Sequence, residues 1–215
     1  MGAVRQLPGG RRLTAVQGGG AQAPGPTDEE LIAAVERGDG SSAGELYDRL
    51  VGVVDRTLYR IFGRRETDHD DLVQATFEQI VLTLAERKYA RACSLSTWAS
   101  TIASHVGLNA LRARRRARAV FAPASEAQGE DVGPTSGPSS TDGERIARVR
   151  CEVERVRRHL AAMAPEKAMA VLLHDVMGHD LAEISVMTGV TVAAAQSRLV
   201  RGRRELGERL GKDEA

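Results

Sequence analysis

Apolar side chains recur every three or four residues along the first half of the chain, the spacing of helices that bury one face. Between residues 27 and 118 the pattern predicts four helices, which begin at Thr27 or Asp28, at Ser41 or Ser42, at Asp68, and at Ser94 or Ser96. Gly38-Asp39-Gly40 and Gly63 are expected to end the first two. The third extends to Leu84, with a buried side made of Leu72, Val73, Phe77, Ile80, Val81 and Leu84. One amphipathic bundle is expected.

A second helical region spans residues 144–210. The pattern predicts helices over residues 144–163 and 166–176, and Pro165 suits the start of the second of these. Two shorter helices follow, separated by Gly189, where a tight turn requires a positive φ. The spacing of apolar residues therefore predicts an all-α fold of two small helical domains.

The last two helices have the pattern of a helix-turn-helix. Asp180 and Glu183 form a capping-box sequence at the start of the first, whose apolar side is Leu181, Ile184 and Met187. Thr191 can cap the second, in which Val192, Ala195 and Leu199 are expected to pack inward. Outward positions are then Gln196, Ser197, Val200 and Arg201. Such a helix can enter a DNA major groove, although a surface hairpin with solvated arginines has the same pattern.

Two segments lack helical periodicity. Residues 1–26 are rich in Gly, Gln, Ala and Pro, which predicts a disordered extension. Residues 119–143 consist mainly of Ala, Pro, Ser, Gly and Thr, and three prolines exclude a continuous helix. We expect this segment to be a flexible linker between domains at residues 27–118 and 144–210.

Charge is unevenly distributed along a chain of 215 residues whose net charge is only +1. Residues 27–84 contain 13 acidic and 6 basic side chains, whereas residues 104–118 contain five arginines and no acid. Such segregation favours two different partners, one of them a polyanion. The arginine run is otherwise a solvated helix end.

The composition also narrows the class of protein. No apolar run is long enough to span a membrane, and residues 1–26 lack the apolar core of a signal peptide. Cys93 and Cys151 are too few for a disulfide framework, which leaves a redox pair as the alternative to two free thiols. We therefore expect a cytoplasmic protein with no membrane insertion and no cofactor.

An enzyme is the rival interpretation. His69-Asp70, His174-Asp175 and His179-Asp180 are His-Asp pairs, as in metal-dependent phosphohydrolases. A metal site needs several such ligands to converge, but the first pair lies in a different predicted domain, and Asp180 is explained as a helix cap. We expect neither a metal site nor a catalytic residue.

Five motifs in order resemble those of bacterial RNA polymerase sigma factors of the extracytoplasmic-function (ECF) group. They are D-L-V-Q-A-T-F at 71–77, L-S-T-W-A-S-T-I-A at 95–103, L-A-A-M-A-P-E-K at 160–167, G-H-D-L-A-E-I-S at 178–185, and G-V-T-V-A-A-A-Q-S-R-L-V-R-G-R at 189–203. That family has two helical domains, called regions two and four, joined by a flexible linker. The resemblance covers residues 27–118 and 144–210.

The resemblance implies a role for each domain. Region two would bind core RNA polymerase through Asp71, Gln74 and Glu78. Its loop at Tyr89–Ser96 would hold a flipped base of the promoter −10 element, and the residues implied at that DNA are Tyr89, Arg91, Ser94, Trp98, His105, Asn109, Arg112, Arg115 and Arg116. Trp98 is better explained as a core residue with an indirect role at DNA, whereas His105 is equally explained as a partly exposed helix residue. Region four would read the −35 element through Gln196, Ser197, Arg198, Val200, Arg201 and Arg204.

The implied activity is promoter recognition and strand opening without covalent chemistry. Its partners would be core RNA polymerase, promoter DNA and an anti-sigma factor. The alternative is a helix-turn-helix regulator that binds DNA without the polymerase, and DNA-binding assays with and without core polymerase separate the two.

Overall fold

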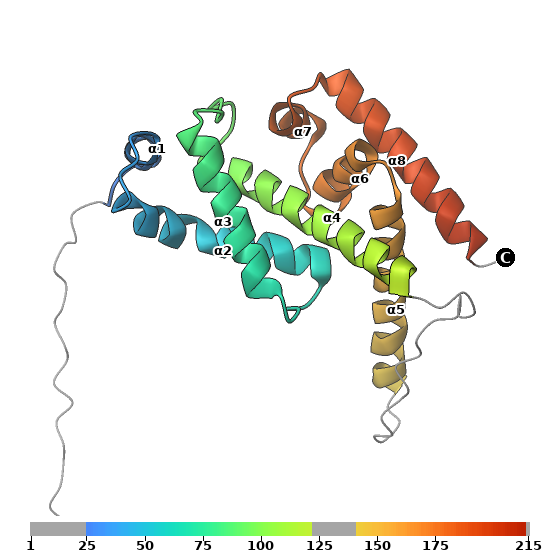
Figure 1. Ribbon diagram of the computed structural model, residues 1–215. Coiled ribbons are helices and arrows are strands. Elements are labelled where there is room, and N and C mark those ends of the chain that lie inside the picture. The colour runs from blue at the N-terminus through green and yellow to red at the C-terminus, as the bar shows by residue number, and fades with distance from the viewer. Residues whose placement is uncertain (1–24, 122–140, 214–215) are drawn as a thin grey trace, which may run out of the picture.

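The structure of the chain is a computed structural model that describes residues 25–121 and 141–213. All regular secondary structure in these ranges is helical, so the predicted all-α class is confirmed (Figure 1). The elements are α1 (Asp28–Glu36), α2 (Ser42–Phe62), α3 (His69–Ala85), α4 (Leu95–Phe121), α5 (Thr141–Ala162), α6 (Pro165–Val171), the π-helical turn η1 (Leu172–Val176), α7 (Leu181–Thr188) and α8 (Val192–Lys212).

The predicted extension and linker lie largely outside the described residues, which exclude 1–24 and 122–140. At both margins of the predicted linker the chain is helical, because α4 continues to Phe121 and α5 begins at Thr141. Residues 119–121 and 141–143 therefore belong to helices. The Ala-Val-Phe stretch after Arg118 contains neither proline nor glycine, which is compatible with the continuation of α4 to Phe121.

Helix α4 is the centre of the N-terminal half. It lies against α2 and α3, and its inner side is formed by Leu95, Ala99, Ala103, Ser104 and Leu108, all at most 2% exposed. The helices approach closely at Gly107, where an added Cβ would lie 2.7 Å from Cδ1 of Ile61. This packing fixes α4 before its arginine run begins.

Two predictions of buried residues fail, and the residue before α2 does not cap it with its side chain. Val81 is 37% exposed because the buried stripe of α3 follows Val73, Phe77, Ile80 and Leu84, and Val81 lies beyond its edge. Val192 is 46% exposed, since the covered side of α8 begins at Ala195. Ser41 precedes α2 but its side chain does not cap the helix. Its hydroxyl instead donates to Asp39 Oδ1 over 2.7 Å.

The C-terminal half is built on α6, which packs against α8, and on η1, which contacts α4, α6 and α7. Pro165 occupies the first turn of α6, as predicted. The end of this helix widens into a π turn, in which the Met177 amide donates to the Leu172 carbonyl over 3.0 Å. Leu172 and Leu173 remain buried within that turn. The sequence pattern did not predict the π turn.

The two halves share one hydrophobic core, and α4 contacts helices of both (Figure 1). Nε of Arg157 on α5 donates to the carbonyl oxygen of Ile61 in the last turn of α2 over 2.6 Å. Gly63, left-handed at φ 68°, makes room for this guanidinium, since a Cβ there would lie 2.3 Å from the nearest Arg157 nitrogen. A polar contact between the halves is therefore a partly buried arginine on a helix carboxyl end, a favourable arrangement for a cation.

Within the described ranges, no helix has both the length and the apolar composition that a membrane span requires.

Candidate nucleic-acid interfaces

The turn between α7 and α8 has the geometry that the sequence predicts. The Glu183 amide donates to Asp180 Oδ1 over 2.8 Å, and the Asp180 amide donates to Glu183 Oε2 over 3.0 Å, which completes the capping box. Gly189 is left-handed at φ 66°, and the Ala194 amide donates to the Thr191 hydroxyl over 3.2 Å. The capping box, the left-handed glycine and the threonine cap thus fix the angle between the two helices.

One side of α8 faces the protein and the opposite side faces solvent. Ile184 of α7 packs with Ala195 and Leu199 of α8, and all three are at most 4% exposed. Of the six residues implied at the −35 element, four are exposed and two are half-buried: Gln196, Val200, Arg201 and Arg204, then Ser197 and Arg198. Nε of Arg201 donates to the Ser197 hydroxyl over 3.1 Å, so its guanidinium lies back along the helix.

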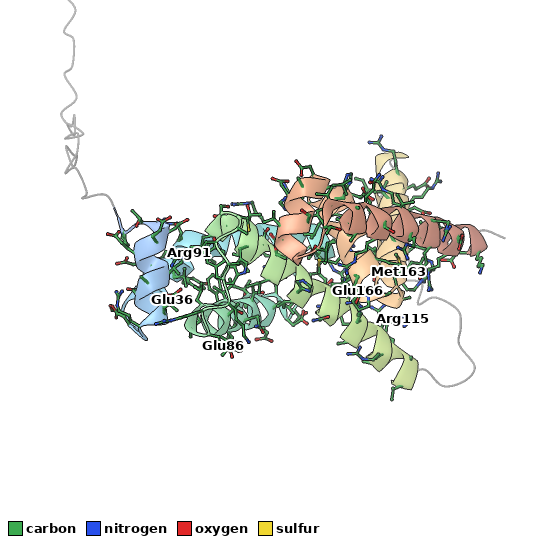
Figure 2. The ribbon with its side chains drawn as sticks, turned by 90° about the horizontal axis from the view of Figure 1, so that it is seen from above. Glu36, Glu86, Arg91, Arg115, Met163 and Glu166 are labelled. Atoms are coloured by element: carbon green, nitrogen blue, oxygen red, sulfur yellow. The ribbon has the colours of Figure 1, made fainter. Side chains whose placement is uncertain are left out.

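The arginine run of α4 divides into engaged and free side chains. Arg114 pairs with Asp68 and lies over the Phe62 ring, 4.6 Å from its centroid. Arg118 lies 3.9 Å from Glu154 of α5. Arg115, labelled in Figure 2, and Arg116 are both exposed. Neither makes an ion pair within the described part of the chain. The free pair are two of the residues that the resemblance implies at the −10 element.

Arg112 is partly withdrawn from solvent. One of its terminal nitrogens is buried without a hydrogen-bond partner among the described residues, and the other donates weakly to Asn109 over 3.4 Å. Burial lowers the pKa of Arg112. The pKa of exposed His105 is also lowered, chiefly by desolvation and then by the charge of Arg112. His105, Asn109 and Arg112 therefore share one side of α4.

The loop between α3 and α4 is held by contacts of its own. The Tyr89 hydroxyl donates to the Cys93 carbonyl over 2.6 Å, and the Tyr89 ring lies 4.7 Å from that of half-buried Trp98. Arg87 and Arg91 have positive φ angles of 55° and 54°. Non-glycine residues rarely adopt this conformation. At Arg87 it ends α3, because the Lys88 amide donates back to the Thr83 carbonyl over 3.0 Å, whereas Arg91 adopts it within the loop.

The start of α4 completes this loop. Ser94 caps the helix by accepting from the Thr97 amide over 3.1 Å. Exposed Arg91 reaches toward α1, where it lies 3.8 Å from Glu36 (Figure 2). The structure thus places Tyr89, Trp98 and Ser94 together, whereas Arg91 is directed to the side.

The outer side of α3 is acidic and polar. Asp71, Gln74 and Glu78 are exposed, and the Gln74 amide donates to Glu78 Oε1 over 2.9 Å. Leu82 continues this side and is 52% exposed. Sequence analysis missed Leu82, although its position four residues after Glu78 is the signal that places it on the same side.

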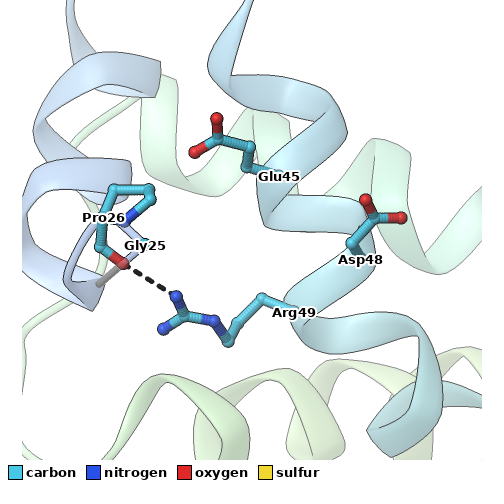
Figure 3. A pocket seen from close by; sticks show the side chains of 5 residues that line it. All are labelled: Gly25, Pro26, Glu45, Asp48 and Arg49. Carbon is cyan, nitrogen blue, oxygen red and sulfur yellow. Dashed lines mark hydrogen bonds between the residues drawn. The ribbon is translucent and has the colours of Figure 1, made fainter. Parts of the chain in front are cut away.

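The three His-Asp pairs do not converge. His69 is buried and its Nε2 lies 2.8 Å from Asp55, whereas His179 contacts Glu183 and His174 contacts its neighbour Asp175. No group of three or more potential metal ligands forms among residues 25–121 and 141–213. The shallow pocket in Figure 3 lies elsewhere, between α2 and the segment before α1, where Arg49 donates to the Pro26 carbonyl over 2.7 Å.

Comparison with known proteins matches both halves. Residues 46–117 match the family described as Sigma-70 region 2, and residues 154–206 match Sigma-70, region 4. The chain is 30% identical over 185 residues to the ECF RNA polymerase sigma factor SigM of Mycobacterium tuberculosis, covering 86% of this chain and 85% of the relative. It is 27% identical over 192 residues to the ECF RNA polymerase sigma factor SigE of Mycolicibacterium smegmatis, covering 87% and 70%.

Among solved structures, CnrH in complex with the cytosolic domain of CnrY is similar at a TM-score of 0.47 and 22% identity, over 85% of this chain and 96% of that chain. The family matches and the mycobacterial relatives define the class: the chain belongs to the ECF group of the sigma-70 family. It is a sigma factor that directs RNA polymerase to promoters.

Proposed function

We propose that α8 reads the −35 element, that α4 and the preceding loop hold the −10 strand, and that α3 binds core RNA polymerase. The observation that carries the proposal is the exposed side of α8, where Gln196, Val200, Arg201 and Arg204 project from a helix fixed by a capped turn. Gln can hydrogen-bond adenine, Arg can bind guanine or phosphate, and an apolar side chain can contact a thymine methyl.

At the −10 element, the chain would act by binding an unpaired strand. Arg115 and Arg116 would contact phosphates, and Tyr89 and Trp98 would form the wall of a base pocket. Extracting a base from the duplex costs a few kcal/mol, and aromatic stacking returns about 1–3 kcal/mol per base. Strand opening then needs the phosphate contacts and the polymerase as well.

The outer side of α3 would bind a basic surface of the polymerase. Asp71 and Glu78 supply negative charge, and Gln74 supplies an amide. Leu82 offers an apolar contact at the end of the same side. Truncating its side chain would remove apolar contact area without removing charge. DNA and polymerase would therefore contact different helices of region two.

The test reconstitutes the protein with core polymerase and maps transcription starts on its own genomic DNA. We expect starts that share −35 and −10 sequences, and little duplex binding by the protein alone. Replacing Gln196 and Arg201 with Ala should relax −35 preference, whereas Asp71→Ala with Glu78→Ala should weaken core binding. Tight DNA binding without core polymerase, and no transcription with it, would instead support the simple regulator.

We further propose an anti-sigma factor as a regulatory partner and the cytoplasm as the site of action, since ECF sigma factors act on cytoplasmic polymerase and DNA. An inhibitor of this kind must cover α3 or a DNA-binding helix. A protein that copurifies from the native cells should therefore block run-off transcription when added before core polymerase. A copurifying protein that leaves transcription unchanged would count against this assignment.

A further inference from the structure

Two adjacent arginines on α8 have different surroundings. Nε of Arg203 donates to Asp175 Oδ2 over 3.0 Å, and a terminal nitrogen donates to the other oxygen of the same carboxylate. His174 Nδ1 lies 3.1 Å from that terminal nitrogen. Arg204, by contrast, lies 3.9 Å from Glu208 of its own helix and is 73% exposed. The sequence alone does not distinguish these two arginines.

The carboxylate comes from the π turn η1. A π turn contains more residues than an α-helical turn and so changes the direction in which the following side chains project. In η1 this leaves Leu172 and Leu173 in the core while Asp175 reaches Arg203. Arg203, followed by the hydrogen bond from His174, keeps the pKa of Asp175 below its usual value, so the pair is charged at neutral pH.

The contact between α6 and α8 explains why such a pair is needed. At Gly202 the two backbones approach so closely that a Cβ would lie 2.8 Å from Val171 Cγ2 and 2.9 Å from the Lys167 carbonyl oxygen. Glycine permits this approach but offers no side chain to interlock with the neighbouring helix. Resistance to rotation of α8 therefore comes from the buried side chains Ala195 and Leu199 nearer its start and from side chains on either side of the crossing.

Ion pairs occupy both of those positions. Arg203 binds Asp175 on one side of the crossing, and Lys167 Nζ lies 2.8 Å from Glu205 Oε2 on the other. Glu205 also accepts from Arg209 one turn further along α8. The bidentate Arg203–Asp175 contact has the more defined geometry, because the planar guanidinium fixes both partners in one plane.

We infer that Arg203 is a positioning residue for the reading helix: its contact with Asp175 sets the rotation of α8, and it does not bind DNA phosphate. This inference rests on the proposed role of α8 at the −35 element. Its consequence is that a residue of η1, which need not touch DNA, controls how Gln196 and Arg201 meet the base edges.

The test measures binding of the reconstituted holoenzyme to a mapped promoter fragment over a series of salt concentrations. The slope of log K against log salt is negative, and each lost phosphate contact reduces its magnitude by about 0.9. Arg203→Ala should weaken binding about threefold to tenfold with an unchanged slope, as expected for a partly exposed bidentate pair. Arg204→Ala is the matched control and should reduce the magnitude of the slope.

Asp175→Asn should reproduce the loss seen for Arg203→Ala, and the double variant should lose no more than either single variant. Arg203→Lys keeps the charge but not the bidentate contact, so it should behave like Arg203→Ala. Thermal unfolding of each variant checks that the helix remains folded. A slope reduced in magnitude by about 0.9 in Arg203→Ala, or wild-type binding by Asp175→Asn, would overturn the inference.

The proposed function is tested separately by scrambling the −35 sequence for the wild-type holoenzyme. Reduced binding supports the role of α8. Unchanged binding would overturn that role and the positioning inference with it, whatever the variants do.

Discussion

Helices α4 and α8 carry five arginines each, yet they present them differently. In α4 all five lie within residues 112–118, beyond the buried part of the helix, whereas in α8 they are spread over residues 198–209. Acids engage Arg114 of α4 and Arg203 of α8 from other elements, at Asp68 and Asp175. The number of arginines on a helix therefore does not determine which of them can meet a nucleic acid; the acids opposite them do.

The two helices also differ in how they are packed. The inner side of α4 is fully buried in the middle of the molecule. Helix α8 lies at the surface on a narrow stripe of Ala195, Leu199 and Gly202. Perturbing α4 should therefore disturb the whole fold, and perturbing α8 mainly the C-terminal half.

The largest effect should come from Leu108→Ala in α4, compared with Leu199→Ala in α8. Truncating a buried leucine costs about 2–5 kcal/mol, and the cost rises where the surroundings cannot collapse. Leu108 is 1% exposed in the shared core, so we expect the greater loss there. Chemical denaturation followed by circular dichroism measures both. Exposed Val200→Ala is the control, and an equal loss in all three variants would contradict the comparison.

Gly202→Val should have the next largest effect. Its side chain would meet a backbone carbonyl, which cannot move without shifting α6, so we expect destabilisation of about 1–3 kcal/mol and weakened −35 binding. Gly207→Val is the matched control on the same helix, because no atom lies within 4 Å of a Cβ there. Melting temperatures and promoter binding report both effects. Similar melting temperatures for the two variants would show that the α6–α8 contact is looser than described.

Removing the caps should cost less. Ser94→Ala and Thr191→Ala each delete one side-chain acceptor at the start of α4 or α8, a loss of about 1 kcal/mol. The two variants should also differ in DNA binding: Ser94→Ala should reduce binding of the −10 strand, and Thr191→Ala should reduce binding of the −35 element. Binding to forked and fully duplex promoter fragments separates these outcomes. Equal losses of affinity for both fragments would contradict the assignment of α4 to the −10 strand and of α8 to the −35 element.

The smallest change in stability should follow Asp68→Asn. This substitution removes the charged partner of Arg114, a partly exposed pair worth less than about 1 kcal/mol. A released Arg114 adds a cation to α4. For single-stranded −10 DNA, the magnitude of the slope of log K against log salt should therefore increase by up to about 0.7. Asp70→Asn, on the same turn, is the control. A slope that stays at the wild-type value would indicate that Arg114 remains held by Phe62 and Glu66.

The features that sequence analysis predicted well depend on near neighbours. The capping box of Asp180 and Glu183, the left-handed Gly189 and the Thr191 cap involve residues within three or four positions of one another, so local chemistry determines them. The exposed side of α3 follows equally from helical spacing.

What the sequence did not reveal depends on tertiary contacts. Arg114 and Asp68 are 46 positions apart, and Arg203 and Asp175 are 28 apart, with no local pattern that links them. The π turn likewise has no signal in the local sequence pattern, and its main contacts are with α4, α6 and α7. The same limit explains Val81, which has an apolar side chain at helical spacing but no neighbour to cover it.

The hydrogen bond from Arg157 to the last turn of α2 has a consequence for affinity. A partner that requires the halves to separate must expose part of the shared hydrophobic core and resolvate a partly buried guanidinium and a helix-end carbonyl. Its apparent dissociation constant is then the intrinsic one divided by the fraction of molecules already open. If one molecule in a hundred is open, binding is weakened about a hundredfold. The hydrogen bond of Arg157 and the shared core together therefore raise the concentration of such a partner that capture requires.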